Sequence, residues 1–408
     1  MKKTLLLSVV ASTMIMAGGD IEPVEPVVEA PAPAAAAETE AATSGWEFGG
    51  KGVVYYQTND TISVSGAGTG DLFEQAASGA DAGIQLKATN KDLFGGVGAG
   101  ITLNGLATLY LENDVVSNVM QQPFNGGWIG EAYLTYGAGN TMFKVGRQTL
   151  PKALSPMAYS ENWNVFENTY DAALIVNSDL PNTTLVGAFV HRWNTNGMHS
   201  DMSKFVKGNG DRGIWMLAAQ NKSIDNLTLT GNIYFAKKFL GGNDLTIYWG
   251  DASYDAGAFG IAGQAATLQS DAFANDPVLW GVKLTGSVSG INLMAAYSDV
   301  QDTWAHIVGG STSAMYTSTA LDQVKPKAKT WTNETKYVLS ASTGLLGGNV
   351  TGVFANSTND HSDYNEFDLV YSTNLTDSVN LTAAYVYADL DALEDPVNLV
   401  RVVGSYKF

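Results

Sequence analysis

The sequence has no cysteine among its 408 residues, which excludes a secreted fold stapled by disulfides. Charged residues are also few, at 15%, whereas glycine occurs 44 times, above its usual share of about 7%. Beyond residue 19, no apolar run approaches the roughly 20 residues that a transmembrane helix needs. This composition is poor for helices and favours strands that are joined by tight turns.

Basic residues are scarce as well. Lys and Arg together number 22, against 40 for Asp and Glu, which gives a formal net charge of −18. A basic face is what phosphate neutralisation requires, so nucleic-acid binding is disfavoured. An acidic pore, or acidic loops that bind divalent cations, agrees with this balance.

Catalytic signatures are missing too. The sequence has no HExxH motif, P-loop lysine or GxSxG elbow, and its four histidines do not show the spacing of metal ligands. We therefore predict that the protein is not an enzyme and has no resident cofactor. The four histidines are His191, His199, His306 and His361.

The N-terminus has the features of an export signal. Lys2 and Lys3 precede a short apolar run that ends in small residues, so residues 1–19 are predicted to be a cleaved signal peptide. Cleavage removes both lysines, and the net charge of −18 then becomes −20. Residues 20–44 are rich in Pro, Ala and Glu and contain no aromatic residue, which predicts an extended periplasmic linker.

From residue 45 onward, apolar and polar residues alternate with period two. In one segment Leu229 and Ile233 lie on one face, and Thr230 and Asn232 lie on the other. A barrel wall requires this pattern when one face meets lipid and the other meets water. A soluble β-sandwich alternates in the same way, so the pattern alone does not separate the two.

The lengths of the connections distinguish a transmembrane barrel from a soluble β-sandwich better than the alternation does. Short connections such as 137–140 and 344–348 alternate with longer ones such as 149–168 and 299–333, and aromatic residues cluster at segment ends. Outer-membrane barrels combine short periplasmic turns with long extracellular loops and aromatic girdles. We therefore predict an all-β fold for residues 45–408: a transmembrane, antiparallel, up-and-down β-barrel of about eighteen strands, with sixteen as the alternative count.

Two segments carry a resemblance to a known family. The terminal run from Val400 to Phe408 resembles the closing strand of outer-membrane porins, and residues 131–136 with 144–148 resemble the major outer-membrane porin of campylobacteria and the related basic-amino-acid porins. The resemblance implies a homotrimer and a C-terminal signal, Tyr406 and Phe408, that is read by the barrel-assembly machinery. No basic ladder is clear enough to imply amino-acid specificity.

The third outer loop, 149–168, is rich in aromatic residues and proline. In porins generally this loop folds inward and narrows the channel, so its carboxylates are predicted to face basic residues on neighbouring strands. The alternative is an ordinary surface loop on the rim of the barrel. The predicted constriction consists of Lys144, Arg147, Lys152, Glu161, Glu167 and Arg192.

A second polar cluster lies in the last two outer loops, near Glu366 and Asp368. Carboxylates in flexible loops suit Ca²⁺, although a solvated acidic rim is the simpler interpretation. The residues of this calcium site are Asp360, Asp363, Asp389, Asp391, Glu394 and Asp395.

Together these features predict a porin in the lipid of the bacterial outer membrane. It is expected to be a passive, weakly cation-preferring aqueous channel for ions and small hydrophilic solutes. Two alternatives stay open, namely a substrate-specific channel and a structural or adhesive surface barrel with a plugged lumen.

Overall fold

The computed structural model describes residues 45–60, 70–305, 314–324, 330–360 and 363–408. The predicted signal peptide (1–19) and linker (20–44) lie outside these residues. Within them, no helix has both the length and the apolar character that crossing a membrane would require. The helices are single turns, such as η3 (Lys152–Leu154) and α1 (Ala320–Val324).

Eighteen long strands form one antiparallel sheet. They are β1 (Glu47–Asn59), β2 (Ser78–Phe94), β3 (Val97–Ala107), β5 (Gly126–Ala138), β6 (Thr141–Gln148), β7 (Tyr170–Asn177), β8 (Thr183–Trp193), β11 (Ile214–Ile224), β12 (Leu227–Leu240), β13 (Asn243–Asp255), β14 (Phe259–Gln269), β15 (Val278–Val288), β16 (Ile291–Ala305), β17 (Thr330–Leu345), β18 (Gly348–Thr358), β19 (Tyr364–Asn374), β20 (Val379–Leu390) and β21 (Val397–Lys407).

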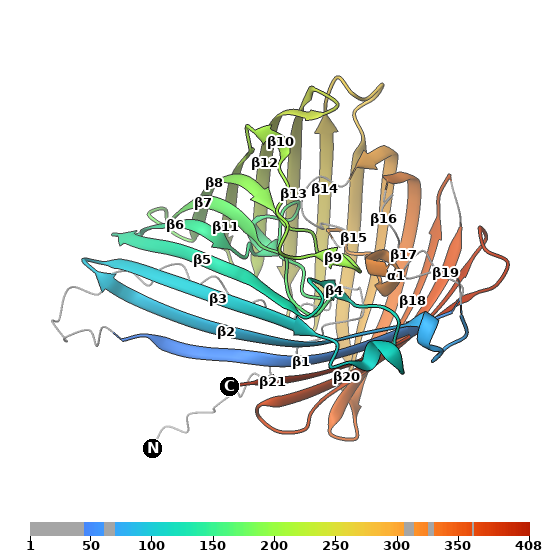
Figure 1. Cartoon of the computed structure of the whole chain (residues 1–408). Helices are drawn as coiled ribbons and strands as arrows, with labels where there is room; N and C mark the ends of the chain where they lie inside the picture. Colours follow the sequence, from blue (N-terminus) through green and yellow to red (C-terminus); the bar gives the residue numbers. More distant parts are fainter. Residues whose placement is uncertain (1–44, 61–69, 306–313, 325–329, 361–362) are drawn as a thin grey trace, which may run out of the picture.

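The sheet closes on itself because the first strand pairs with the last. Val54 of β1 lies opposite Ala82 of β2 on one side and opposite Gly404 of β21 on the other. Each remaining strand pairs with its neighbours in chain order, so the wall has no free edge, and Figure 1 shows the strands curving around to form one closed wall. The predicted eighteen-stranded, up-and-down β-barrel is confirmed.

The two ends of the barrel differ. At one end, which we call the turn end, the connections are as short as 95–96, 139–140 and 289–290. Ser289 and Gly290 both have positive φ there, as a tight hairpin turn requires. At the other end, the loop end, most connections are long, such as 60–77 and 149–169, and residues 241–242 are the short exception.

The wall has an apolar outward face and a more polar inward face. In β12, Leu229 and Ile233 are 41% and 45% exposed, whereas Thr230 and Asn232 are buried at 7% and 3%. Large apolar residues are exposed around the wall in the same way, as expected of a surface that meets lipid. The predicted two faces of this segment are confirmed.

Connections from the loop end fill part of the interior. Two of them pair through the short parallel strands β4 (Gln121–Gln122) and β9 (Ser200–Asp201). Met120, Phe166 and Met202 from three different connections pack in one buried cluster with Tyr55 of β1. The lumen is therefore narrowed by chain that folds back into the barrel.

Candidate solute pathway through the barrel

Residues 149–169, which we call the inner loop, cross the barrel interior. The loop leaves β6 and returns to β7, yet its backbone reaches two distant parts of the wall. The Tyr55 hydroxyl of β1 donates to the Trp163 carbonyl at 3.2 Å, and the Met157 amide donates to the Tyr234 hydroxyl of β12 at 3.3 Å. Such a loop limits the cross-section of any pathway through the barrel.

The two predicted carboxylates of the inner loop have different surroundings. Glu161 is only 4% exposed, and its Oε1 accepts a hydrogen bond from the Tyr159 hydroxyl at 3.2 Å. Its backbone amide donates to Asn168 at 2.7 Å. Glu161 therefore holds the loop together and does not face a water-filled gap, which corrects its predicted place at the constriction.

Glu167 lies against the wall of β1 and β2. Burial raises the pKa of its carboxyl group, and the positive charge of Lys51 opposes this rise. The ammonium group of Lys51 also lies 5.5 Å from the centre of the Phe166 ring in the same loop. Of the two predicted loop carboxylates, Glu167 is the one that faces a basic side chain of the wall.

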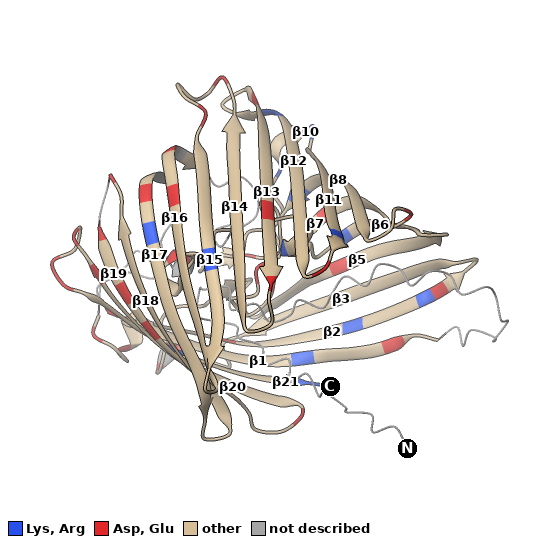
Figure 2. Cartoon of the chain, turned by 180° about the vertical axis from the view of Figure 1, so that it is seen from behind, with Lys and Arg blue, Asp and Glu red and all other residues tan. Residues whose placement is uncertain are grey.

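Basic side chains line this part of the wall on β2 and β6, with β3 and β5 between them. Lys144 of β6 lies 3.9 Å from the centre of the Tyr133 ring, and Lys87 of β2 lies 3.8 Å from Glu131 of β5. Figure 2 shows basic segments within β1 and β2. The predicted inward position of Lys144 agrees with the structure, whereas Lys51 and Lys87 were not predicted.

Arg147 and Arg192 do not belong to the lumen. Arg147 lies opposite Ala132 and Asp171, and Asp171 lies opposite Arg192, so these cross-strand partners share one face of the wall. The exposed Val145, two positions before Arg147, shows that this face is the outward one. Their predicted place in the constriction is therefore wrong, because an odd offset from Lys144 puts Arg147 on the opposite side.

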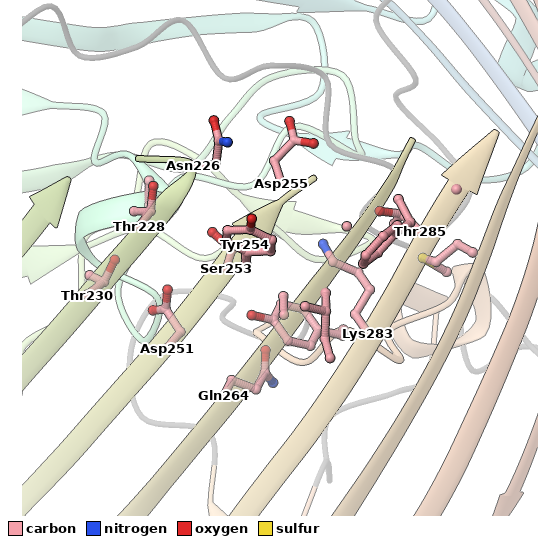
Figure 3. A pocket seen from close by; sticks show the side chains of 18 of the residues that line it. Asn226, Thr228, Thr230, Asp251, Ser253, Tyr254, Asp255, Gln264, Lys283 and Thr285 are labelled. Atoms are coloured by element: carbon pink, nitrogen blue, oxygen red, sulfur yellow. The ribbon is translucent and has the colours of Figure 1, made fainter. Parts of the chain in front are cut away.

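A chamber of about 570 Å³ lies between the inner loop and the strands β12 to β16 (Figure 3). The predicted residue Lys152 lines it from the inner loop, and Lys283 lines it from β15. Carboxylate, hydroxyl and amide side chains provide most of the remaining polar lining. These are Asn226, Thr228, Thr230, Asp251, Ser253, Asp255, Gln264 and Thr285.

Charges of both signs meet in the chamber. The Trp249 indole N–H donates to Asp251 Oδ2 at 3.0 Å, and the Lys283 ammonium lies 4.6 Å from the centre of the Tyr316 ring. A polar cavity of this size can hold a small hydrated solute, with hydrogen-bond partners on several sides. It faces the turn end, since it includes residues of the turn 256–258.

A second inward segment, 314–324, is held by a buried ion pair. Lys336 of β17 donates from Nζ to Asp322 Oδ2 at 2.7 Å and to Thr319 Oγ1 at 2.8 Å. Glu366 of β19 accepts the Leu321 amide at 2.7 Å. From the sequence alone, this segment is only part of a long connection, and the inward positions of Lys336 and Glu366 in their strands were the available signal.

The predicted calcium site is not assembled. In the described residues, no three side chains of His, Cys, Asp or Glu are placed to hold a metal ion together. Asp360 instead accepts from Asn333 at 2.7 Å, and Asp363 accepts the Asn359 amide at 3.2 Å. These two carboxylates serve loop contacts.

The C-terminus seals the wall beside β1. The amide of Phe408 donates to the Gly50 carbonyl at 3.1 Å, and the Gly50 amide donates back to the Phe408 carbonyl at 2.9 Å. The Tyr406 and Phe408 rings stack at 5.8 Å on the outward face. Both predicted signal residues thus lie at the closing seam, and their reading by an assembly machinery stays a prediction.

Comparisons with known proteins give the fold class. No family model and no curated protein matches the sequence. The structure matches a BenF-like porin from Pseudomonas fluorescens Pf-5 with a TM-score of 0.68 and 13% identity, over 89% of this chain and 98% of that one. Two Pseudomonas aeruginosa structures, OccD3 (OpdP) and OpdK with vanillate, match with TM-scores of 0.64 and 0.67 and identities of 14% and 11%. They too cover 89% of this chain, with 91% of OccD3 and 98% of OpdK.

The chain therefore has the closed, eighteen-stranded fold of outer-membrane porins. At identities this low the likeness concerns the fold alone. The resemblance to campylobacterial porins is carried by short segments of sequence and stays a prediction.

Proposed function

We propose that the protein is a channel of the bacterial outer membrane through which ions and small hydrophilic solutes diffuse passively. The observation that carries the proposal is a closed wall, apolar outside, around a chamber of about 570 Å³ with polar and charged lining. A neighbouring structure is named as the outer membrane protein OpdK, which supports the same location. We retain a weak cation preference, because the formal net charge of −18 favours cations over anions.

Conductance in planar bilayers tests this function. We expect discrete single-channel steps, and a reversal potential in a KCl gradient that indicates cation preference and weakens as salt screens the charges. Insertion without conductance would identify the alternative of a plugged surface barrel. An open channel must be distinguished from a plugged barrel by experiment, because the inner loop and segment 314–324 both make buried contacts inside the barrel.

The cation preference should depend on pH through Glu167. Because burial raises the pKa of this carboxyl group above its ordinary value of 4.5, it is neutralised at a higher pH than an exposed glutamate. Lowering the pH should therefore reduce the cation preference in a step that Glu167→Gln abolishes. Reversal potentials measured from pH 7 downward check this. Glu161→Gln is the comparison, and an equal loss of the step there would contradict the assignment to Glu167.

A second candidate is a substrate-specific channel. Lys51, Lys87 and Lys144 place positive charges on one wall, which favours solutes that carry an anionic group. Two neighbouring structures are complexes with glucuronate and with vanillate. A saturable block of the current by one small carboxylate, absent with an uncharged sugar of similar size, would favour this candidate.

We also propose a homotrimer that is inserted by the barrel-assembly machinery. Because Phe408 pairs with Gly50 at the closing seam, its deletion should lower the amount of folded barrel and leave aggregated chains in the periplasm. The measurement is the fraction of protein with heat-modifiable mobility in gel electrophoresis. Phe408→Tyr keeps an aromatic residue and serves as the control. A normal amount of folded barrel after the deletion would show that Phe408 is not part of an assembly signal.

A further inference from the structure

Strands β1 and β2, next to the closing seam, hold one end of the inner loop. The Tyr55 hydroxyl of β1 donates to the Trp163 carbonyl at 3.2 Å. The Phe166 ring packs on Gly83 of β2, where an added Cβ atom would lie only 2.7 Å from the ring. Trp163 and Phe166 are 4% and 0% exposed. This end of the loop, which we call the seam end, is therefore in close contact with the wall.

Arg401 brings the last strand, β21, into the same contact. It lies opposite Gln57 of β1 and donates from Nε to Gln57 Oε1 at 2.8 Å. Its guanidinium carbon lies 5.6 Å from the centre of the Tyr55 ring and 5.6 Å from the centre of the Trp163 ring. Both distances are within the range of cation–π contacts, which are stronger when the partners are desolvated. Arg401 therefore contacts the wall through Gln57 and Tyr55 and the inner loop through Trp163.

Burial separates Arg401 from the basic residues that line the lumen. Arg401 is 1% exposed, whereas the side chain of Lys87 is 48% exposed. A buried guanidinium group loses hydration, and contacts with aromatic rings and an amide oxygen offset part of that cost. Because a solute in the lumen does not touch Arg401, this residue can affect the pathway only through the position of the loop.

The other attachment of the inner loop is of a different kind. The Met157 amide donates to the Tyr234 hydroxyl of β12 at 3.3 Å. Leu154, Met157 and Ala158 belong to the same buried apolar cluster as Tyr234. Since this attachment lies on a distant part of the wall and is largely apolar, loss of Arg401 should release only the seam end.

We propose that Arg401 is the positioning residue of the inner loop. Its guanidinium group fixes Trp163 at the closing seam and thereby sets the width of the pathway on that side. The inference rests on the proposed channel for its electrical readout. Its chemical readout holds whether or not the barrel conducts.

The accessibility of an introduced cysteine tests the attachment in the full-length barrel. The chain has no cysteine, so Val165→Cys places a single thiol at a buried position of the seam end. Adding Arg401→Met should raise its rate of modification by a water-soluble methanethiosulfonate about tenfold, since a desolvated cation–π contact contributes roughly one order of magnitude. Arg401→Lys keeps the positive charge and should restore most of the protection. Ala158→Cys reports on the other attachment, and its rate should not change.

Single-channel recording tests the effect on the pathway. Arg401→Met should add openings of roughly twofold larger conductance, because a loop released at one end leaves more of the cross-section open. Arg401→Lys should show few of these openings. Arg212→Met, at an exposed arginine of the loop end, is the matched control and should change neither the conductance nor the thiol rates.

Two results would overturn the attachment, namely an unchanged rate for Val165→Cys and an equal rise for Ala158→Cys, which would indicate general unfolding of the loop. A raised thiol rate with unchanged conductance would reject the role in setting the width. A native barrel without current would reject the proposed channel alone, because the thiol rates still decide whether Arg401 holds the loop. If Arg401→Met lowers the fraction with heat-modifiable mobility, Trp163→Leu takes its place. It leaves the seam intact and should give the same two results.

Discussion

Replacing residues 152–166 by a short Gly-Ser link should raise single-channel conductance roughly threefold, because the open cross-section of a narrow pore controls its current. The inner loop crosses the interior from β6 to contacts at Tyr55 and Tyr234, so its removal opens the space that these residues close off. Single-channel recording in planar bilayers measures the effect. The change should exceed that of any single charge substitution.

A matched control for this deletion is the connection 270–277, which is also at the loop end. Shortening it should leave conductance nearly unchanged, because Asp271 and Asn275 within it are exposed. Heat-modifiable mobility shows whether each variant is folded. If the shortened inner loop conducts like the intact protein, the narrowest point lies elsewhere, and segment 314–324 is then the next candidate.

Lys336→Met should destabilise the barrel by about 3–5 kcal/mol, the usual cost of removing one partner from a buried ion pair. Lys336 and Asp322 are 3% and 7% exposed, and the substitution leaves Asp322 without its ammonium partner next to Glu366. The urea concentration at which the folded barrel unfolds in detergent measures the loss. Asp322→Asn added to Lys336→Met should restore most of the stability, because it removes the orphaned charge.

The control is an exposed ion pair of the same type. Lys204 lies 3.0 Å from Asp201, and its side chain is 80% exposed, so Lys204→Met should cost at most about 1 kcal/mol. Equal effects of Lys204→Met and Lys336→Met would mean that the buried pair does not hold segment 314–324.

The strands were predictable from the sequence because period two and turn residues are local signals. The predicted count of about eighteen strands matches the structure, and the predicted short connections 137–140 and 344–348 contain the observed turns 139–140 and 346–347. Period two also separates Lys144 from Arg147, since three positions place them on opposite faces. This offset alone places Arg147 on the outward face, outside the lumen.

The positions of the other predicted site residues depend on tertiary contacts that cannot be inferred from local sequence patterns. The register between β7 and β8 shifts next to His191, and this irregularity brings Arg192 opposite Asp171. Likewise, the burial of Glu161 depends on Tyr159 and Asn168 in a loop that folds only against the finished wall. Irregular pairing and loop packing are tertiary effects, and neither produces a periodic pattern along the chain.

The seam between β1 and β21 has a consequence for the timing of folding. Arg401 donates to Gln57 at 2.8 Å across this seam, and the two residues are 344 positions apart. Bringing these two positions together has the largest loop-closure entropy cost of any contact in the wall. The contact also cannot form until nearly the whole chain has reached the membrane. Until then β1 and β21 both present unpaired backbone groups, which bilayer interiors do not tolerate and which invite pairing with other chains. The last ten residues therefore determine when the barrel closes and can no longer pair through its edge strands with other chains. Synthesis errors near the C-terminus should for this reason be more harmful than equal errors in any loop.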